Sequence, residues 1–527
     1  MIIIRSVNLP LDTDFSEVTQ IVSNCLKLPI NKIKSASLYK KSVDARHKNN
    51  VCFNCSFTAE IFGDEAKIVK KNKNVELYSE PNYIYKTAKS ISQPVVVGFG
   101  PAGMFAALTL ARAGLKPIVI ERGEDVDTRK HHVDTFLSGG KLNPESNVQF
   151  GEGGAGTFSD GKLNTGIKDI RCREVLKVFV NFGADKKILY EAKPHIGTDV
   201  LINIVKNIRN EIITLGGQVL FGHKLMGIET ENGKVISVTA QNGDAQKNIV
   251  CEELVLATGH SARDIFEMLS GMGVTLTQKP FSVGARIEHK QADINRAMYG
   301  EFCENKNLGA ADYKLAVHLP SGRGVYTFCM CPGGEVINSS SEIGGITVNG
   351  MSYSSRNGEN ANSALLVEIK PEDLDAEDIM SGVRLQRTIE KNAYNLANGS
   401  VPYCYVGDLL GKPVSNKVTP TVKPKTVHTD IYRVLPQFVA DSIKQALPEF
   451  EKKIKGFSSC GAVLTFPETR STSPIRIVRD ENYVSLSLNG LYPTGEGAGY
   501  AGGIMSAAVD GMRVAEKIID FFNGQNR

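Results

Sequence analysis

The residue pattern with the clearest chemical purpose is a glycine-rich turn between an apolar segment and a helical one. It consists of Gly98, Gly100, Pro101, Ala102 and Gly103, after the apolar residues 94–97 and before the helical segment 104–113. In a G-x-G-x-x-G turn, the first glycine permits the tight bend, the second lets the backbone approach a pyrophosphate, and the third allows close helix–strand packing. The free N–H groups at the start of the helix add donors and a positive dipole for the phosphates. The pattern therefore predicts a dinucleotide-binding site.

An acidic residue follows where such a site needs one. The next apolar segment, residues 117–120, leads into Glu121 and Arg122. The Glu121 carboxylate can accept hydrogen bonds from the hydroxyls of an adenosine ribose. Its charge also disfavours a ribose 2′-phosphate, because two negative charges would meet. We therefore expect Glu121 and Arg122 to contact a dinucleotide that lacks a 2′-phosphate.

Two further segments with small side chains favour FAD over a nicotinamide dinucleotide. One is the loop 151–161, in which Gly153, Gly154, Ala155, Gly156, Thr157 and Ser159 could hold a flavin or a pyrophosphate. Backbone amides exposed by such a loop form concavities that bind anions. The other is the apolar segment 254–257 followed by Thr258 and Gly259, as in two-dinucleotide-binding flavoproteins, where the chain passes close to the cofactor.

The third segment that favours FAD lies near the C-terminus. It contains Gly495, Glu496, Gly502, Gly503 and Ile504, before a helix predicted over 506–522. It resembles the C-terminal flavin motif in which an acid, usually Asp, binds a ribityl hydroxyl, so Glu496 would take that role. The N-terminus of the helix would face the N1 side of the flavin and favour its anionic reduced form. We predict FAD bound non-covalently, because no motif places a His, Cys or Tyr for covalent attachment.

Longer motifs extend the resemblance over nearly the whole chain. They are FGEGGAGTFSDGKL (150–163), PHIGTD (194–199), ATGHSARD (257–264), FCMCPGG (328–334), NGMSYSSR (349–356), ETRSTSPIRI (468–477) and YPTGEGAGYAGGI (492–504). With these motifs the chain resembles the uncharacterised FAD-dependent dehydrogenases within the glutathione-reductase-like flavoproteins. The resemblance implies the fold and FAD, and it leaves the substrate open.

Several domains must position these motifs, because 527 residues are too many for one hydrophobic core. We predict an α/β protein: a Rossmann-like FAD-binding domain (89–261 and 456–527) with an inserted α+β substrate domain (262–455). A small α+β domain (1–88) precedes them. In it, residues 2–7 form a strand, Asp14 and Glu17 begin a helix, and the apolar and polar residues of 51–58 alternate as in a half-buried strand. Residues 80–94 form the linker.

Two cysteine pairs could carry redox chemistry, but ordinary structural roles compete with that interpretation. Cys52 and Cys55 lie three residues apart on a predicted strand, so their thiols point to opposite faces. Cys329 and Cys331 would share one face of the predicted strand 325–331, either as a redox pair or as structural cysteines. Neighbouring same-face residues of a regular strand lie too far apart for an easy disulfide.

Candidates for substrate binding precede the C-terminal flavin motif. Arg470 and Arg476, with Arg479, could bind an anionic substrate, or they could pair with Glu468 and Asp480. His260, His289 and His318 are scattered, and each is interpreted as a structural histidine before a catalytic one. The catalytic residues are not predicted. No metal is expected, since no HExxH or comparable ligand motif occurs.

The composition sets the remaining expectations. A net charge of +4 implies no strong attraction to nucleic acid, and no apolar run is long enough for a membrane helix or a signal peptide. We expect a cytoplasmic FAD-dependent oxidoreductase that transfers a hydride through flavin N5 to or from a small-molecule substrate. NAD(P)H would be a transient reductant, since no second G-x-G-x-x-G turn between a strand and a helix follows residue 262. The oligomeric state is left open.

Two alternatives to an ordinary oxidoreductase depend on other features of the chain. Residues 27–48 carry a local net charge of +6, which could let the small domain of a flavoprotein dock RNA. The other alternative is a binding module in which FAD is structural.

Overall fold

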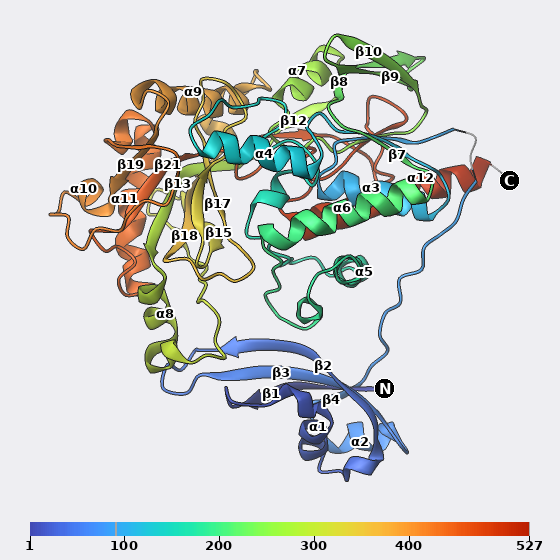
Figure 1. The fold of residues 1–527 in the computed structure, drawn as a ribbon, viewed down its shortest axis with the longest axis vertical. Coiled ribbons are helices and arrows are strands. Elements are labelled where there is room, and N and C mark those ends of the chain that lie inside the picture. The colour runs from blue at the N-terminus through green and yellow to red at the C-terminus, as the bar shows by residue number, and fades with distance from the viewer. Residues whose placement is uncertain (90–91, 526–527) are drawn as a thin grey trace.

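A four-stranded antiparallel sheet and two helices form the small N-terminal domain of the computed structural model, which describes residues 1–89 and 92–525 (Figure 1). In spatial order the strands are β2 (Ile33–Asp44), β3 (Cys52–Ile61), β1 (Ile2–Leu9) and β4 (Val75–Leu77), with α1 (Val18–Leu26) and α2 (Glu65–Lys71) packed beside them. The expected alternation is present in β3, because Phe53, Cys55 and Phe57 are at most 2% exposed while Cys52 is partly accessible. Asp14 caps the turn before α1 by accepting a hydrogen bond from the Ser16 N–H at 2.8 Å.

One contact of the small domain with the rest of the molecule is made by the backbone of β2. The Lys41 N–H donates to the Tyr190 carbonyl at 2.7 Å, and the Ala192 N–H donates to the Lys41 carbonyl at 2.8 Å. The chain then leaves the domain along the right side of Figure 1, where Lys86 pairs with Asp520 at 2.7 Å. The predicted linker 80–94 includes residues 90 and 91, which lie outside the described residues.

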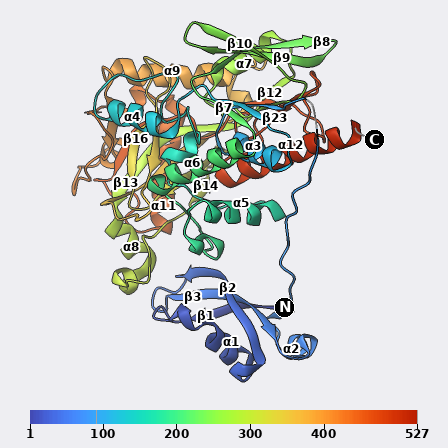
Figure 2. The same ribbon diagram turned by 45° about the vertical axis from the view of Figure 1, so that its right-hand side comes forward.

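A five-stranded parallel sheet forms the centre of the dinucleotide-binding part. Its order is β23 (Leu491–Pro493), β11 (Leu254–Leu256), β5 (Val95–Val97), β6 (Ile118–Ile120) and β7 (Gln218–Leu220). The nearby helices are α3 (Pro101–Arg112), α4 (Val126–Leu137), α5 (Ile170–Asn181), α6 (Thr198–Thr214) and α12 (Ile504–Gln525) (Figure 2). The central strands β5 and β11 are apolar throughout and at most 4% exposed, as expected for parallel strands covered on both faces.

Smaller elements cover the other side of this sheet. The strands β8 (Lys224–Glu231), β9 (Lys234–Asn242) and β10 (Ala245–Val250) form an antiparallel sheet. The helix α7 (Arg263–Gly271) follows β11, and β12 (Leu276–Gln278) pairs with β22 (Ile475–Ile477).

A seven-stranded mixed sheet forms the third part, at the left of Figure 1. Its order is β14 (Ala316–His318), β15 (Gly324–Cys331), β18 (Asn360–Ile369), β13 (Phe281–Lys290), β21 (Val463–Glu468), β19 (Val401–Tyr405) and β20 (Thr426–His428). Around it lie β16 (Glu335–Asn338), β17 (Val348–Met351), α8 (Gln291–Tyr299), α9 (Ser381–Leu396), α10 (Val406–Leu410) and α11 (Gln437–Lys453). The predicted fold class, a Rossmann-like domain with an inserted α+β domain and a small N-terminal α+β domain, is confirmed.

One strand lies on the other side of a predicted boundary. The strand β21 pairs antiparallel with β13, so it belongs to the seven-stranded sheet and not to the FAD-binding segment predicted over 456–527. The sequence could not show this, because the partner strand lies almost two hundred residues earlier. Within residues 1–89 and 92–525, no helix combines the length and apolar character that crossing a membrane requires.

Candidate functional site

A cavity of about 330 Å³ lies at the carboxyl ends of β5, β6 and β11. Ligands of open α/β sheets bind at this edge, where the strand order reverses. The predicted residues that line it are Gly98, Gly100, Pro101, Ala102, Glu121, Arg122, Gly154, Ala155, Gly156, Ser159, Thr258, Gly259, Arg470, Glu496, Gly502, Gly503 and Ile504. The predicted residues outside its lining are Gly103, Gly153, Thr157, Gly495 and Arg476. Four segments far apart in the sequence therefore meet around one space.

The three glycines of the G-x-G-x-x-G turn, Gly98, Gly100 and Gly103, have different surroundings. A Cβ on Gly98 would lie 2.4 Å from the Ala257 carbonyl oxygen, and Gly98 has a φ of +94°. A Cβ on Gly103 would lie 1.9 Å from the Gly98 carbonyl oxygen. At Gly100, by contrast, the nearest atom would be the Cα of Gly154 at 3.6 Å, an ordinary contact. The first and third glycines are therefore needed for packing, whereas the second leaves space at the cavity.

Glu121 holds the neighbouring loops together. Its Oε2 accepts from the Phe99 N–H at 2.7 Å, and its Oε1 accepts from the N–H groups of Gly123 and Gly151 at 2.9 and 3.0 Å. A carboxylate oxygen has two lone pairs, so Oε2 can accept one more hydrogen bond. Beside it, Arg122 pairs with Glu145 and Asp264 at 2.8 and 2.7 Å. The acid that was predicted for a ribose also has a structural role.

Arg129 on α4 lies outside the cavity lining but supports it, and sequence reasoning missed this residue. Its side chain is fully buried and donates to the carbonyls of Asn147 and Val148 at 2.8 and 3.0 Å and of Glu152 at 2.6 Å. Burial lowers the pKa of Arg129 to about 10, so the guanidinium stays charged at neutral pH. The polar composition of the segment 126–137 gave no sign that one arginine turns inward. Arg129 fixes the loop that leads into the glycines of 151–156.

Glu496 and His260 meet on another wall of the cavity. Their nearest atoms, Glu496 Oε1 and His260 Nδ1, are 3.6 Å apart. Burial raises the pKa of Glu496 to about 8, which Lys279 partly opposes, and burial together with Arg470 lowers the pKa of His260 to about 3. At neutral pH the pair is therefore mostly a carboxylic acid beside a neutral imidazole. The His260 Nε2 is buried and has no partner of hydrogen-bond geometry among the described residues.

The arginines before the flavin motif do not form one anion-binding cluster. Arg470 is 7% exposed and pairs with Glu390 of α9 at 2.8 Å, not with Glu468, one of the two acids considered as alternatives. Arg476 is exposed, lies outside the cavity and stacks over the Tyr500 ring at 5.2 Å. The alternative of pairing with Glu468 and Asp480 is not what the structure has either, since Glu468 pairs with Arg286 at 2.7 Å and Arg479 pairs with Asp510 at 2.7 Å.

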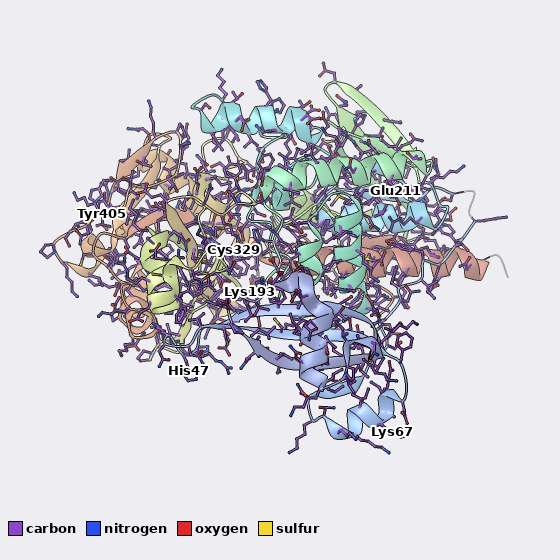
Figure 3. All side chains as sticks on the ribbon, turned by 60° about the horizontal axis from the view of Figure 1, so that its bottom comes forward. His47, Lys67, Lys193, Glu211, Cys329 and Tyr405 are labelled. Carbon is purple, nitrogen blue, oxygen red and sulfur yellow. The ribbon has the colours of Figure 1, made fainter. Side chains whose placement is uncertain are left out.

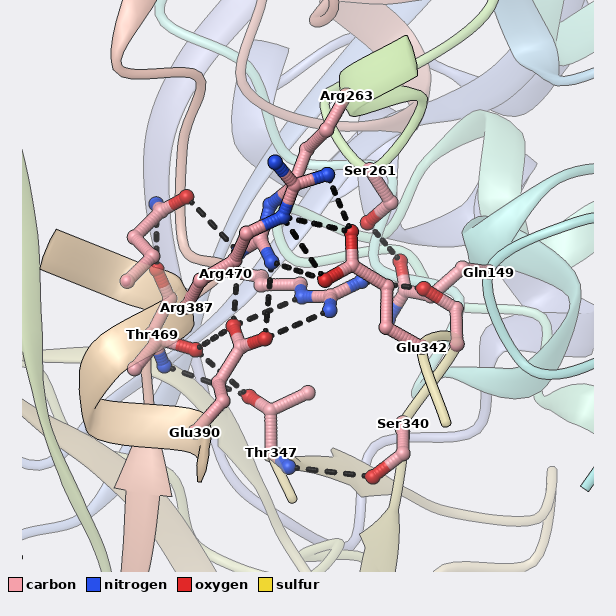
Figure 4. Close-up of polar contacts among 12 residues, drawn as sticks. Gln149, Ser261, Arg263, Ser340, Glu342, Thr347, Arg387, Glu390, Thr469 and Arg470 are labelled. Carbon is pink, nitrogen blue, oxygen red and sulfur yellow. Dashed lines mark hydrogen bonds and ion pairs between the residues drawn. The ribbon is translucent and has the colours of Figure 1, made fainter. Parts of the chain in front are cut away.

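Glu390 is the centre of a buried ionic network next to the cavity (Figure 4). It binds Arg470 and also Arg263 of α7, whose nitrogen lies 2.8 Å from a Glu390 oxygen. Thr469 donates to the same carboxylate at 2.6 Å. Although burial alone would raise it, the two arginines hold the pKa of Glu390 well below its usual range. The network joins the dinucleotide-binding part to the seven-stranded sheet.

The strand β15 is irregular at the second cysteine pair. Phe328 pairs with Ala364 and Cys331 pairs with Asn362, so β15 has one more residue than β18 in this stretch. Cys329, in this bulge, has a φ of +42°. The prediction of a regular strand was wrong at this point, because β15 has a bulge here and a bulge re-aims the side chains next to it. Cys329 lines the cavity and Cys331 is buried.

Lys162 lines the cavity, and the sequence reasoning did not single it out. Its ammonium lies 2.8 Å from Asp160 Oδ2 and donates to the carbonyl of Met330, between the two cysteines. Arg356 pairs with the other side of Asp160. The only signal in the sequence was the acid–glycine–lysine order at the end of the motif 150–163.

The fold and the site together define a flavoprotein-type dinucleotide site, and the comparisons with known proteins agree. Residues 92–300 match a family model described as pyridine nucleotide-disulphide oxidoreductase, residues 280–471 one described as FAD-dependent protein, C-terminal domain-like, and residues 1–60 a domain of unknown function. An uncharacterised protein of Clostridium beijerinckii is 46% identical over 532 residues, which cover 99% of each chain. The chain belongs to this family of FAD-dependent oxidoreductases. Its cofactor is non-covalently bound FAD.

Solved structures are more distant. A flavin-dependent brominase is 13% identical with a TM-score of 0.39, covering 82% of this chain and 80% of its own. A geranylgeranyl bacteriochlorophyll reductase-like protein of Thermoplasma acidophilum is 13% identical with a TM-score of 0.36, covering 82% and 79%. Likenesses this weak carry no argument about the reaction. The comparisons also give no support to the RNA-associated alternative.

Proposed function

We propose that FAD lies along the cavity and that the FAD-loaded protein oxidises or reduces a small-molecule substrate. A nicotinamide dinucleotide would serve as transient reductant. The observation that supports this best is the convergence of the glycine turn, the loop 151–161, the segment 258–259 and the segment 495–504 on one cavity. The fingerprint turn and the N-terminus of α3 would hold the pyrophosphate, and Glu121 would accept from the ribose. Glu496 and the N-terminus of α12 would lie along the ribityl chain and the flavin.

The residues present fit such a cofactor. At Gly502 and Gly503, before α12, an added Cβ would meet no atom within 4 Å, so the backbone there borders open space. Gly100 leaves similar room beside the start of α3. When bound, FAD would supply two-electron chemistry by accepting or donating a hydride at N5. The chain itself would orient the cofactor and keep water from it.

The titratable side chains of the cavity could also supply and accept the protons of a redox reaction. The Glu496 carboxyl, with a pKa of about 8, can hold a proton at neutral pH and release it to a substrate. His260, neutral over the same range, can accept a hydrogen bond from it at Nδ1. The Lys and Arg side chains that line the cavity each pair with an acid: Arg122 and Lys224 with Asp264, Lys162 with Asp160, and Arg470 with Glu390. We therefore infer a substrate that is not strongly anionic.

The test begins with the flavin. Heating the purified protein should release FAD, identified by mass, and anaerobic NADH or NADPH should bleach the bound flavin. Release of FMN, or no flavin after reconstitution with FAD, would contradict the proposal. A screen of oxidants for the reduced protein then names the acceptor class.

A pair of glycine variants locates the cofactor. Gly100→Val should fold and lose FAD affinity by well over tenfold, which is more than about 1.4 kcal/mol of binding free energy. The reason is that its side chain would occupy the space kept free for the pyrophosphate. Gly103→Ala should instead lower the free energy of unfolding by about 1–3 kcal/mol, because its Cβ meets the Gly98 carbonyl. Isothermal titration with FAD and urea unfolding separate the two effects, and normal FAD affinity in Gly100→Val would show that the site is misplaced.

A further inference from the structure

The strands β12 and β22 carry two cations on one face of a two-stranded ribbon. Thr277 of β12 lies opposite Arg476 of β22, and the ladder continues as the Lys279 N–H donates to the Pro474 carbonyl at 2.9 Å. Residues 277 and 279 share a face of the strand, and diagonal neighbours across an antiparallel pair are within reach of long side chains. Lys279 and Arg476 are therefore neighbours, and we call them the rim cations.

The C-terminal flavin motif, residues 492–504, packs directly against this ribbon. A Cβ on Gly499 would lie 3.0 Å from the Ile475 carbonyl oxygen and 3.1 Å from the Arg476 Cα. In the same motif Glu496 lines the cavity, and the positive charge of Lys279 acts on its carboxyl group. The rim cations therefore border the cavity on the side of Glu496, although neither belongs to its lining.

No acid neutralises the rim cations within residues 1–89 and 92–525. Neither side chain forms an ion pair there, and Arg476 instead stacks over the Tyr500 ring at 5.2 Å. The acid that acts on Lys279 is Glu496, which keeps its proton at neutral pH and supplies no negative charge. Burial and the Arg476 charge lower the pKa of Lys279, as expected where a counter-charge is missing. A partly buried cation without a partner costs free energy unless a ligand supplies the charge.

The rim cations differ from the other positive charges of the chain. Each Lys or Arg that lines the cavity pairs with an acid, so the lining has no spare charge for a second polyanion besides FAD. The basic segment 27–48 belongs to the small domain, and Figure 3 shows His47 there, away from Cys329 of the cavity lining. At the cavity, the rim cations therefore supply the charge that the anionic part of a ligand would need.

We propose that Lys279 and Arg476 bind the pyrophosphate of the nicotinamide dinucleotide, whose nicotinamide then reaches the cavity; the proposal rests on the proposed FAD-dependent function. Each phosphate of a dinucleotide carries a negative charge, and each rim cation supplies a positive one. Guanidinium and ammonium groups are suited to phosphate oxygens. The G-x-G-x-x-G turn before α3 would hold the FAD pyrophosphate. No second such turn follows residue 262, so side chains take its role for the second dinucleotide.

This placement accounts for transient binding of the reductant. Arg476 is exposed and Lys279 is only partly buried. Exposed ion pairs are weak and are screened by salt. A dinucleotide held mainly at its pyrophosphate leaves readily once the flavin is reduced, and the cavity is then free for the substrate.

The first experiment measures how FAD-loaded variants bind the reductant. Anaerobic stopped-flow reduction at several NADH and NADPH concentrations gives a Kd and a limiting rate of flavin bleaching. Lys279→Gln and Arg476→Gln should each raise the Kd about fivefold, the contribution of one partly exposed charge pair, while the limiting rate falls much less. Absorbance at 450 nm should show normal FAD content in both variants.

A matched control removes a charge elsewhere on the body. Arg296 is an exposed residue of α8, which lies at the lower left of the body in Figure 1, whereas β12 lies at the top. Arg296→Gln should leave the Kd and the limiting rate unchanged.

The second experiment tests the anion site without reducing the flavin. Isothermal titration of the oxidised, FAD-loaded wild type with inorganic pyrophosphate should show one site whose Kd rises with salt concentration. The double variant Lys279→Gln/Arg476→Gln should bind pyrophosphate at least about tenfold more weakly, since both charges are gone. Pyrophosphate should also compete with NADH in the wild type.

The outcomes separate this inference from the proposed function. An unchanged Kd for NADH and NADPH in both single variants, at normal FAD content, would overturn the inference. It would also be overturned if the variants raised the KM of an anionic acceptor and left the Kd of the reductant unchanged. Bleaching by NADH without pyrophosphate binding contradicts only this inference, whereas pyrophosphate binding without bleaching by NADH or NADPH contradicts the reductant of the proposed function.

Discussion

At the scale of single residues, Glu496 combines a carboxyl group with surroundings that disfavour its charge. Burial raises its pKa to about 8, and the Lys279 charge only partly opposes this. His260, whose Nδ1 lies 3.6 Å from Glu496 Oε1, is itself held neutral, so it supplies no countercharge. The charge state of Glu496 in the cofactor-free protein therefore changes close to physiological pH.

This environment predicts how stability depends on pH. A carboxyl whose pKa is higher in the folded state binds more protons there, so its contribution is complete below the unfolded pKa near 4.5 and is lost as pH rises to about 8. The glutamine in cofactor-free Glu496→Gln cannot ionise. The difference between the Tm of this variant and that of the wild type should therefore increase in the variant's favour from pH 5 to pH 8 and stay constant above pH 8. Thermal unfolding of both proteins at pH 5, 6.5, 8 and 9 measures the difference. A Tm difference that does not change with pH would show that Glu496 is ionised in the folded protein throughout this range.

The same residue revises an expectation about FAD. The sequence predicted that Glu496 binds a ribityl hydroxyl, and an ionised carboxylate would accept a strong hydrogen bond from it. A protonated acid accepts a weaker, neutral hydrogen bond, so Glu496→Gln should cost FAD affinity mainly above pH 8. Residue type and spacing identified Glu496 as a site residue. Its protonation state, however, depends on how deeply the carboxyl is buried, and only the folded chain defines that.

At the scale of elements, Glu390 shows how three segments are joined. The helix α9 supplies the acid, α7 supplies Arg263, and the residues after β21 supply Arg470. Glu390→Gln removes the charge that both buried arginines share, and breaking a buried ion pair costs about 3–5 kcal/mol. Urea unfolding should show a loss of that size in the free energy of unfolding.

An arginine on the exposed face of the same helix provides the control for this prediction. Arg384 pairs with Asp378, and its side chain is 60% exposed. Arg384→Ala should cost no more than about 1 kcal/mol, the usual limit for exposed pairs. Equal losses in the two variants would mean that Glu390 does not carry the network.

The elements that the sequence predicted best are those whose signals are local. The succession β5, glycine turn, α3 and β6 lies within about thirty residues, and each part shows its own apolar or glycine pattern. The pairings Arg470–Glu390 and β21–β13 join residues 80 and more positions apart. No local pattern encodes such partners, so Glu390 was not among the acids considered for Arg470, and the boundary near 455 came too early. The bulge at Cys329 was missed for the same reason, because its neighbours Lys162 and Arg286 come from other elements.

At the scale of the whole molecule, the small N-terminal domain has a core of its own. Ile2, Phe53 and Phe57 pack within its sheet and are not part of the cavity. Its contacts with the body include the β2 backbone pairing with residues 190–192 and the packing of Phe302 and Leu308. The cofactor-binding part should therefore fold without it.

A chain that begins at Glu80 tests this separation. We expect it to be purified with the same FAD-to-protein ratio as the full chain and with a similar affinity for FAD, since every lining residue of the cavity remains. Absorbance at 450 nm against protein concentration measures the ratio. A truncated protein that folds, as judged by circular dichroism, but lacks FAD would show that the small domain supports the cavity from a distance.

The Arg129 clamp has a consequence for how the cofactor is gained and lost. Because the guanidinium holds the carbonyls of Asn147, Val148 and Glu152 from within the protein, the loop's shape does not depend on a phosphate that arrives later. Little conformational entropy remains to be lost when the dinucleotide enters, so the association is that of a ligand with a rigid, preorganised receptor. Such a receptor can release its cofactor and take it up again without local refolding. The rate at which FAD exchanges between protein and solution is then set by the dissociation of bound FAD. The binding site keeps the same shape through repeated cycles of release and binding.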